Sequence, residues 1–166
     1  MTTTDWEFIA HCLRQELADY GDLLRLFEQQ QRHLFDRDAD AVLRLANDIE
    51  AQARTLADCR GRREQAVAAF AELRGRPANT SLRALLPEIE ADARPLLEAL
   101  INEVNALLHR VRRTSRHNHT LLARTVELHQ ETLMQLRPQA FTKTYSPAGR
   151  VSVAAMRPPS SLRIAG

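Results

Sequence analysis

Histidine and carboxylate side chains are the groups of this sequence that could bind a metal, and their spacing argues against it. In helical proteins a di-metal site uses glutamates that precede histidines by three residues on inward-facing helices, and no histidine here has such a glutamate. Glu7 and His11 lie four residues apart, but no second pair supports them. His117 and His119 would point to different faces of a helix. The sequence therefore predicts no metal and no cofactor.

Enzymatic motifs are also missing from the sequence. It contains no glycine-rich phosphate loop and no Gly-x-Ser-x-Gly nucleophile elbow. The carboxylates are spread along helical faces that we expect to be exposed to solvent. The sequence therefore predicts a protein that is not an enzyme and has no catalytic residues.

The two cysteines, Cys12 and Cys59, lie at or beside apolar helical positions. Two cysteines are too few for a disulfide framework, and buried free thiols are typical of a reducing compartment. We expect both to be reduced, and to lie close together without a bond.

The densest basic run is "HRVRRTSRHNH", residues 109–119, in which Arg110, Arg113 and His117 share one helical face. Phosphate binding is conceivable there. The run lacks aromatic residues, however, and the chain has no broad basic footprint. We expect no nucleic-acid partner.

Charge is distributed unevenly around a net value of +2. No acidic residue follows Glu131, whereas five basic residues do: Arg137, Lys143, Arg150, Arg157 and Arg163. No apolar run is long enough to span a bilayer, and the first residues lack the basic leader of a secretory signal. We therefore expect a cytoplasmic protein with a slightly acidic body, a basic tail and no stable membrane insertion.

Apolar residues recur every three or four positions over three long stretches, which predicts helices. We expect helices at about residues 4–35, 39–74, 80–86 and 88–136, the third being a single turn. The predicted fold is all-α: an antiparallel, coiled-coil-like bundle of three long helices over residues 1–136, followed by a flexible, disordered tail over residues 137–166.

The last helix leaves two questions open. Pro95 either kinks it or stands in its first turn, where proline is tolerated. Asn118 replaces an apolar residue of the seam, either as a buried residue that fixes register or because the helix is exposed there. The helix is long enough to overhang its partners, which would leave apolar residues near its end uncovered.

The tail after Pro138 shows no periodicity and is rich in proline, serine and arginine. In "RVSVAAM", Val151 and Val153 alternate with polar or small residues, which would suit a strand added to a partner's sheet. A disordered tail is the prediction, with strand pairing as the alternative.

Taken in order, several segments resemble the FlgN family of flagellar export chaperones. They are an aspartate-rich turn, "SLRALLP" (residues 81–87), an Asn-Leu-Leu element at Asn118, Leu121 and Leu122, and a tail tyrosine, Tyr145, followed by Gly149. Ser146 and Pro147 depart from the family, which usually has glycine directly after the tyrosine.

The resemblance implies a cytosolic chaperone that binds hook–filament junction proteins, prevents their premature assembly and delivers them to the flagellar type III export gate. An amphipathic helix of such a protein would pack on the uncovered end of the last helix. The residues expected to bind it are Asn118, Leu121, Leu122, Val126, Leu133 and Leu136. The resemblance also implies that Tyr145 docks on the cytoplasmic domain of the export gate.

The same apolar stripe leaves two alternatives open. Its residues could be covered within their own bundle. The chain could instead be a self-associating structural coiled-coil protein without cargo, whereas a carrier is expected to be a monomer or a weak homo-oligomer.

Overall fold

The structure, a computed structural model, describes residues 5–136, 141–145 and 151–155, with side chains described from residue 6 to residue 136. The chain divides into two compact units, Met1–His119 and Thr120–Gly166. The elements in chain order are α1 (Asp5–Asp36), α2 (Ala39–Leu73), α3 (Leu82–Leu85), the 3-10 turn η1 (Leu86–Glu88), α4 (Arg94–Leu136), β1 (Phe141–Tyr145) and β2 (Val151–Ala155). The predicted helical class is confirmed by the four α-helices.

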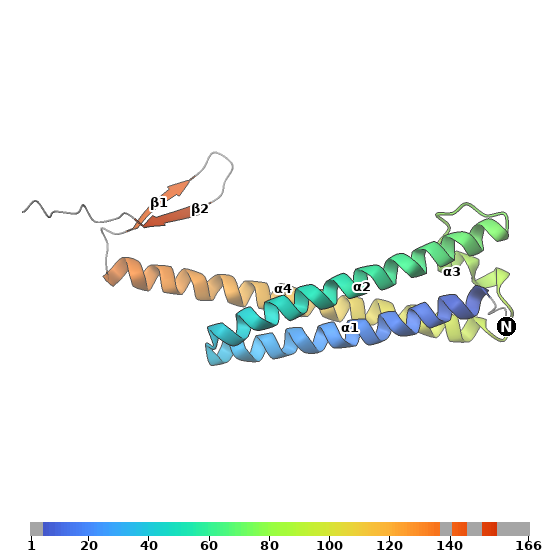
Figure 1. Cartoon of the computed structure of the whole chain (residues 1–166), viewed down its shortest axis with the longest axis horizontal. Coiled ribbons are helices and arrows are strands. Elements are labelled where there is room, and N and C mark those ends of the chain that lie inside the picture. The colour runs from blue at the N-terminus through green and yellow to red at the C-terminus, as the bar shows by residue number, and fades with distance from the viewer. Residues whose placement is uncertain (1–4, 137–140, 146–150, 156–166) are drawn as a thin grey trace, which may run out of the picture. The chain divides into compact units, whose positions relative to one another are not determined.

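Helices α1 and α2 form an antiparallel hairpin and lie side by side (Figure 1). Between them Arg37 takes a left-handed backbone conformation with φ of 59°. Asp38 then caps α2, because its Oδ1 accepts a hydrogen bond from the Ala41 amide at 3.0 Å. The aspartate-rich turn thus ends one helix and starts the next, as the sequence predicted.

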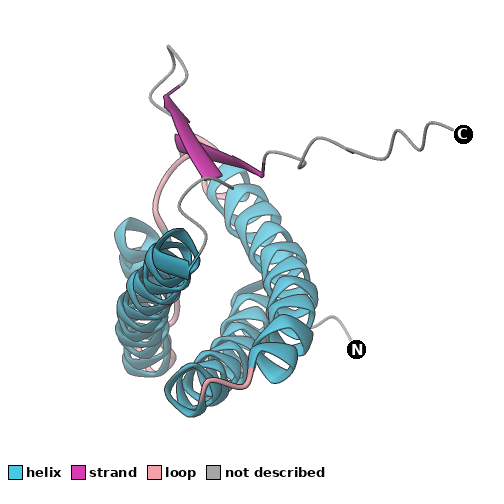
Figure 2. Ribbon diagram, turned by 90° about the vertical axis from the view of Figure 1, so that its left-hand side faces the viewer, coloured by secondary structure: helices cyan, strands magenta, loops and turns pink. Residues whose placement is uncertain are grey.

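The core of the first unit is built from the apolar stripes that the sequence analysis identified. Helices α1 and α2 run along a common direction, which Figure 2 views nearly end on. The buried apolar members of the stripes of α1, α2 and α4 include Ile9, Leu13, Tyr20, Leu24, Val42, Leu56, Phe70, Leu97, Leu100, Val104 and Val111. The periodicity therefore predicted most of the core.

The connection from α2 to α4 closes one end of this core. Gly75, with φ of 67°, follows the end of α2, and the left-handed conformation favours glycine. Ser81 caps α3, and Leu82 and Leu85 of that turn are buried. The predicted short helical turn is therefore present and contributes two leucines to the core.

Helix α4 begins at Arg94 rather than near residue 88, with Pro95 in its first turn. The first turn lacks intrahelical partners for its amides, so proline costs nothing there. The Arg94 side chain donates hydrogen bonds to the Pro87 and Ile89 carbonyl oxygens at 2.7 and 2.8 Å. This settles the question at Pro95: the helix starts there and is not kinked by it.

In the second unit, β1 and β2 pair as an antiparallel hairpin, with Phe141 opposite Ala155 and Tyr145 opposite Val151. The sequence analysis expected a disordered tail and considered pairing of "RVSVAAM" only with a partner protein. The structure instead pairs these residues with "FTKTY" of the same chain. Threonine and aromatic residues favour strands, a signal in residues 141–145 that the analysis did not use.

Candidate protein-binding surface

Apolar side chains remain exposed on α4 after Asn118. The exposed fractions are 41 % for Leu122, 47 % for Val126, 49 % for Leu133 and 73 % for Leu136. Leu121 is half-buried. Leu128, which the sequence analysis did not select, is 63 % exposed. Five of the six residues predicted to bind cargo thus lie on one stretch of α4 with accessible side chains.

We call this stretch the α4 surface: Leu121, Leu122, Val126, Leu128, Leu133 and Leu136. Its members recur at helical spacing and continue the stripe that is buried earlier in α4. Exposed leucines scattered singly need no explanation, whereas several large apolar side chains exposed along one stretch of a helix indicate an interaction site. The α4 surface is therefore the candidate functional site of the chain.

Asn118 was predicted to bind cargo, but its side chain is not accessible to a partner. Its side chain is 3 % exposed. Its Nδ2 donates to the Phe27 carbonyl oxygen at 2.7 Å and approaches Gln30 Oε1 at 3.2 Å, both on α1. Asn118 is thus committed to contacts inside its own chain, and we leave it out of the α4 surface. It is the last buried residue of α4 among those the structure describes.

Replacing Asn118 tests whether it fixes the pairing of α4 with α1. We expect Asn118→Ala to lower the free energy of unfolding by about 1–2 kcal/mol, because the hydrogen bond to Phe27 and the packing are both lost. Asn118→Leu should cost less, since it fills the volume and removes Oδ1, which is buried without a partner. Urea denaturation measures both variants, and a leucine variant less stable than the alanine variant would contradict this account.

A buried ion pair in the first unit was missed by the sequence analysis. Glu16 of α1 is fully buried, and its Oε2 accepts a hydrogen bond from Arg63 Nε of α2 at 2.7 Å. Arg60 Nε lies 3.8 Å from Glu16 Oε1. Asp19, one turn further on, is also buried. The expectation that carboxylates lie on exposed faces was therefore wrong for Glu16 and Asp19.

The two cysteines lie close together, as predicted. Cys12 and Cys59 are free and buried, and Cys59 Sγ lies 3.7 Å from the Cys12 carbonyl oxygen. Burial raises the pKa of both thiols above the ordinary value. Thiolate is the reactive form of cysteine, so these thiols have a packing role in the α1–α2 hairpin.

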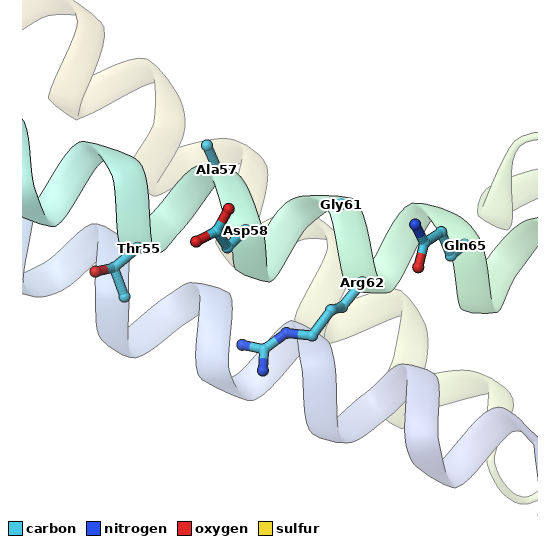
Figure 3. Close-up of a pocket in the computed structure, with 6 residues that line it drawn as sticks. All are labelled: Thr55, Ala57, Asp58, Gly61, Arg62 and Gln65. Atoms are coloured by element: carbon cyan, nitrogen blue, oxygen red, sulfur yellow. The ribbon is translucent and has the colours of Figure 1, made fainter.

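A shallow hollow on α2 is lined by Thr55, Ala57, Asp58, Gly61, Arg62 and Gln65 (Figure 3). It lies over Gly61, where an added Cβ atom would meet nothing within 4 Å beyond the adjacent residues and the backbone of its own helix. Arg62 extends from α2 toward α1 and also lines a smaller hollow with Cys12 and Cys59. All six residues of the larger hollow come from α2, so the hollow is a depression on the surface of one helix.

The model of the FlgN protein family matches residues 6–152 of the chain. The chain belongs to the FlgN family. No curated protein and no solved structure matches the sequence significantly. FlgN membership indicates a general role as a flagellar export chaperone that binds flagellar proteins.

Two further features of this FlgN chain bear on its partners. No helix in the described part of the chain is long and apolar enough to cross a membrane. Among the same residues, no group of three or more potential metal-ligating side chains comes together, and His11 belongs to no such cluster.

The FlgN match also includes Tyr145, the predicted docking residue. Its backbone ends β1, opposite Val151 at the start of β2. The tyrosine is therefore held next to the connection between the strands, residues 146–150, which lies outside the described residues.

Proposed function

We propose that this chain is a cytoplasmic carrier for hook–filament junction proteins. It binds an amphipathic terminal helix of its cargo, prevents premature assembly and delivers the cargo to the flagellar type III export gate. The observation that carries this proposal is the α4 surface, whose large apolar side chains stay accessible while the earlier part of the same helix is buried.

The geometry of the α4 surface suits a helix as ligand. Leu122, Val126, Leu133 and Leu136 follow one another at steps of four, seven and three. These steps keep them on one side of the helix, where the apolar stripe of a second helix can cover them by ridges-into-grooves packing. The terminal helices of junction proteins form coiled coils in the assembled filament, so they carry such a stripe. A carrier that covers this stripe would keep the helices apart until export.

Binding of a peptide tests the proposal directly. The probe is the terminal-helix peptide of the hook–filament junction protein from the same organism, titrated into the full chain by calorimetry. We expect micromolar or tighter binding and a negative heat-capacity change, because apolar surface is buried. A folded chain that binds no such peptide would contradict the carrier function.

Delivery to the export gate is assigned to Tyr145. A tyrosine ring buries a large apolar area at low cost in side-chain entropy, and its hydroxyl finds a polar partner. The FlgN family match extends through this residue. Its backbone lies at the end of β1, paired with Val151 of β2.

We expect Tyr145→Ala to weaken binding to the purified cytoplasmic domain of the gate by about tenfold or more. Peptide binding and thermal stability should stay unchanged. Tyr145→Phe is the matched control, because it keeps the ring and removes only the hydroxyl. A lower melting temperature for Tyr145→Ala would instead show that the ring supports the fold.

Self-association is the second candidate, because the same exposed stripe could pair with a second copy of the chain. Sedimentation velocity of the full chain, with and without the peptide, separates the two functions. A monomer that binds peptide supports the carrier. A tight oligomer that the peptide does not dissociate supports the structural coiled-coil protein.

A further inference from the structure

A line of polar residues runs along the middle of the α4 surface. Thr125, His129 and Thr132 are spaced by four and three residues, and Leu136 follows after another four. At 3.6 residues per turn this spacing keeps them on one face. The same geometry places Leu121 and Leu128 on one flank of the line, and Leu122, Val126 and Leu133 on the other.

Each polar side chain of this line hydrogen-bonds to the backbone of its own helix. Thr125 Oγ1 donates to the Leu121 carbonyl oxygen at 2.9 Å, and Thr132 Oγ1 donates to that of Leu128 at 2.8 Å. His129 Nδ1 lies 2.7 Å from the Thr125 carbonyl oxygen. Because their donors are already satisfied, the two threonines can be covered by an apolar helix without leaving a hydroxyl proton unpaired.

His129 differs from the threonines in keeping one strong polar atom for the partner. A carbonyl oxygen only accepts hydrogen bonds, so the contact with Thr125 assigns the proton to Nδ1. In the neutral ring Nε2 is then a free acceptor. A helix that covers the α4 surface also covers this nitrogen, and an acceptor buried without a donor weakens binding by about five- to 150-fold.

Charged residues are absent from the centre of this face. The charged residues of this stretch of α4 are Arg124, Glu127 and Glu131, and their spacing from His129 places them on the opposite side of the helix. The two threonines of the polar line and the apolar residues beside it carry no charge, and Arg124 lies at the outer edge of the flank formed by Leu121 and Leu128. At the centre of this face a partner is therefore distinguished by shape and by hydrogen bonding.

We infer that His129 selects cargo: it favours an amphipathic helix whose apolar face carries one hydroxyl or side-chain amide, placed to donate a hydrogen bond to Nε2. The inference rests on the proposed carrier function and names the chemistry of its ligand. A single polar residue within an apolar helix seam fixes register and partner at some loss of stability. Here the polar residue lies on the carrier, and its complement lies on the cargo.

The experiment combines variants of both helices at pH 8. Calorimetry measures the affinity of the full chain and of His129→Leu for the junction-protein peptide. It is repeated with peptides in which each serine, threonine, asparagine or glutamine of the apolar face is replaced by leucine in turn. His109→Leu is the matched control, because His109 is an exposed histidine on the opposite side of α4.

We expect one substituted peptide to bind the original chain at least tenfold more weakly, and His129→Leu to weaken binding of the original peptide to a similar extent. The two changes together should restore the affinity to within about threefold. His109→Leu should have no effect on any peptide.

Two results would overturn the inference. The first is that the His129→Leu variant binds the original peptide as tightly as the original chain does. The second is that the original chain binds tightly to a peptide whose apolar face has no hydrogen-bond donor. Either result would show that Nε2 needs no donor. Either result leaves the carrier function standing, because the peptide still binds. Failure of the original chain to bind any peptide would overturn the carrier function and this inference together.

Discussion

Arg63→Met is expected to lower the free energy of unfolding by about 3 kcal/mol. The substitution removes the closest partner of Glu16, whose carboxylate is fully buried and 2.7 Å from Arg63 Nε. Methionine matches the length of the arginine stem but cannot pair with a carboxylate. Arg60, at 3.8 Å from Glu16 and 44 % exposed, offers only a weak replacement. A charge left unpaired inside a protein is costly.

The double variant Glu16→Leu with Arg63→Met should recover most of the loss, because a buried ion pair and a well-packed apolar pair contribute similarly to stability. Arg54→Met is the matched control. Arg54 and Glu50 form an ion pair on the same helix, but their side chains are 74 % and 65 % exposed. Exposed pairs contribute little, so we expect a change below about 0.5 kcal/mol.

Urea denaturation measures the free energy of unfolding of the original chain, the two single variants and the double variant. Equal effects of Arg63→Met and Arg54→Met would show that water reaches Glu16 in solution. A double variant less stable than Arg63→Met alone would show that the pair itself, and not the burial of a lone charge, stabilises the α1–α2 hairpin.

The second large effect concerns binding: Val126→Asp with Leu133→Asp is expected to weaken cargo-peptide binding at least 100-fold. Each variant replaces a contact of roughly 1.5–3 kcal/mol with a carboxylate that the bound helix would desolvate. Both side chains are about half exposed, so the unbound chain should keep its helical circular dichroism and its melting temperature.

Leu43→Asp provides the control for this change. Leu43 is a leucine in the first turns of α2, 66 % exposed, and outside the α4 surface. The substitution should leave peptide binding unchanged, because Leu43 is not part of the α4 surface. It should also leave the fold intact, because an acidic residue near the start of a helix interacts favourably with the helix dipole. Unchanged binding by the double variant of Val126 and Leu133 would show that cargo binds elsewhere than on the α4 surface. A large drop in its melting temperature would show that these side chains belong to the core.

Helical periodicity was sufficient to predict the class of the fold and most of its core. Ile9, Leu13 and Phe70 are buried because the stripe that contains them is one face of a helix. The sequence could not predict whether Pro95 kinks the last helix or starts it, because a proline inside an apolar stripe is compatible with both. The two hydrogen bonds of Arg94 to the preceding turn, which fix the start, depend on a loop conformation that periodicity does not encode.

Burial of polar residues was harder to predict, because it depends on which side chains meet across helices. Arg63 lies in the apolar stripe of α2, and Glu16 lies between Leu13 and Tyr20 on α1. Taken alone, each charged residue only interrupts the apolar stripe of its helix. Together they form a pair, and only the register of the hairpin shows it. The same limit applied to Asn118, whose partner is a backbone carbonyl on α1.

The tail shows a different limit. The sequence predicted a disordered tail, and a strand at Val151 and Val153 was only the alternative, with another protein as its partner. Residues 141–145 supply that partner in the structure. A separation of five residues with Pro147 and Gly149 is short enough for a local hairpin.

The position of Asn118 divides α4 into two stretches that selection can treat differently. Up to Asn118, substitutions of the buried residues disturb the folded core and are tolerated poorly. Beyond it, Leu122, Val126 and Leu133 are exposed, so their replacement costs the fold little. A lineage could therefore change its cargo preference by mutations after Asn118 and inherit the rest of the protein intact.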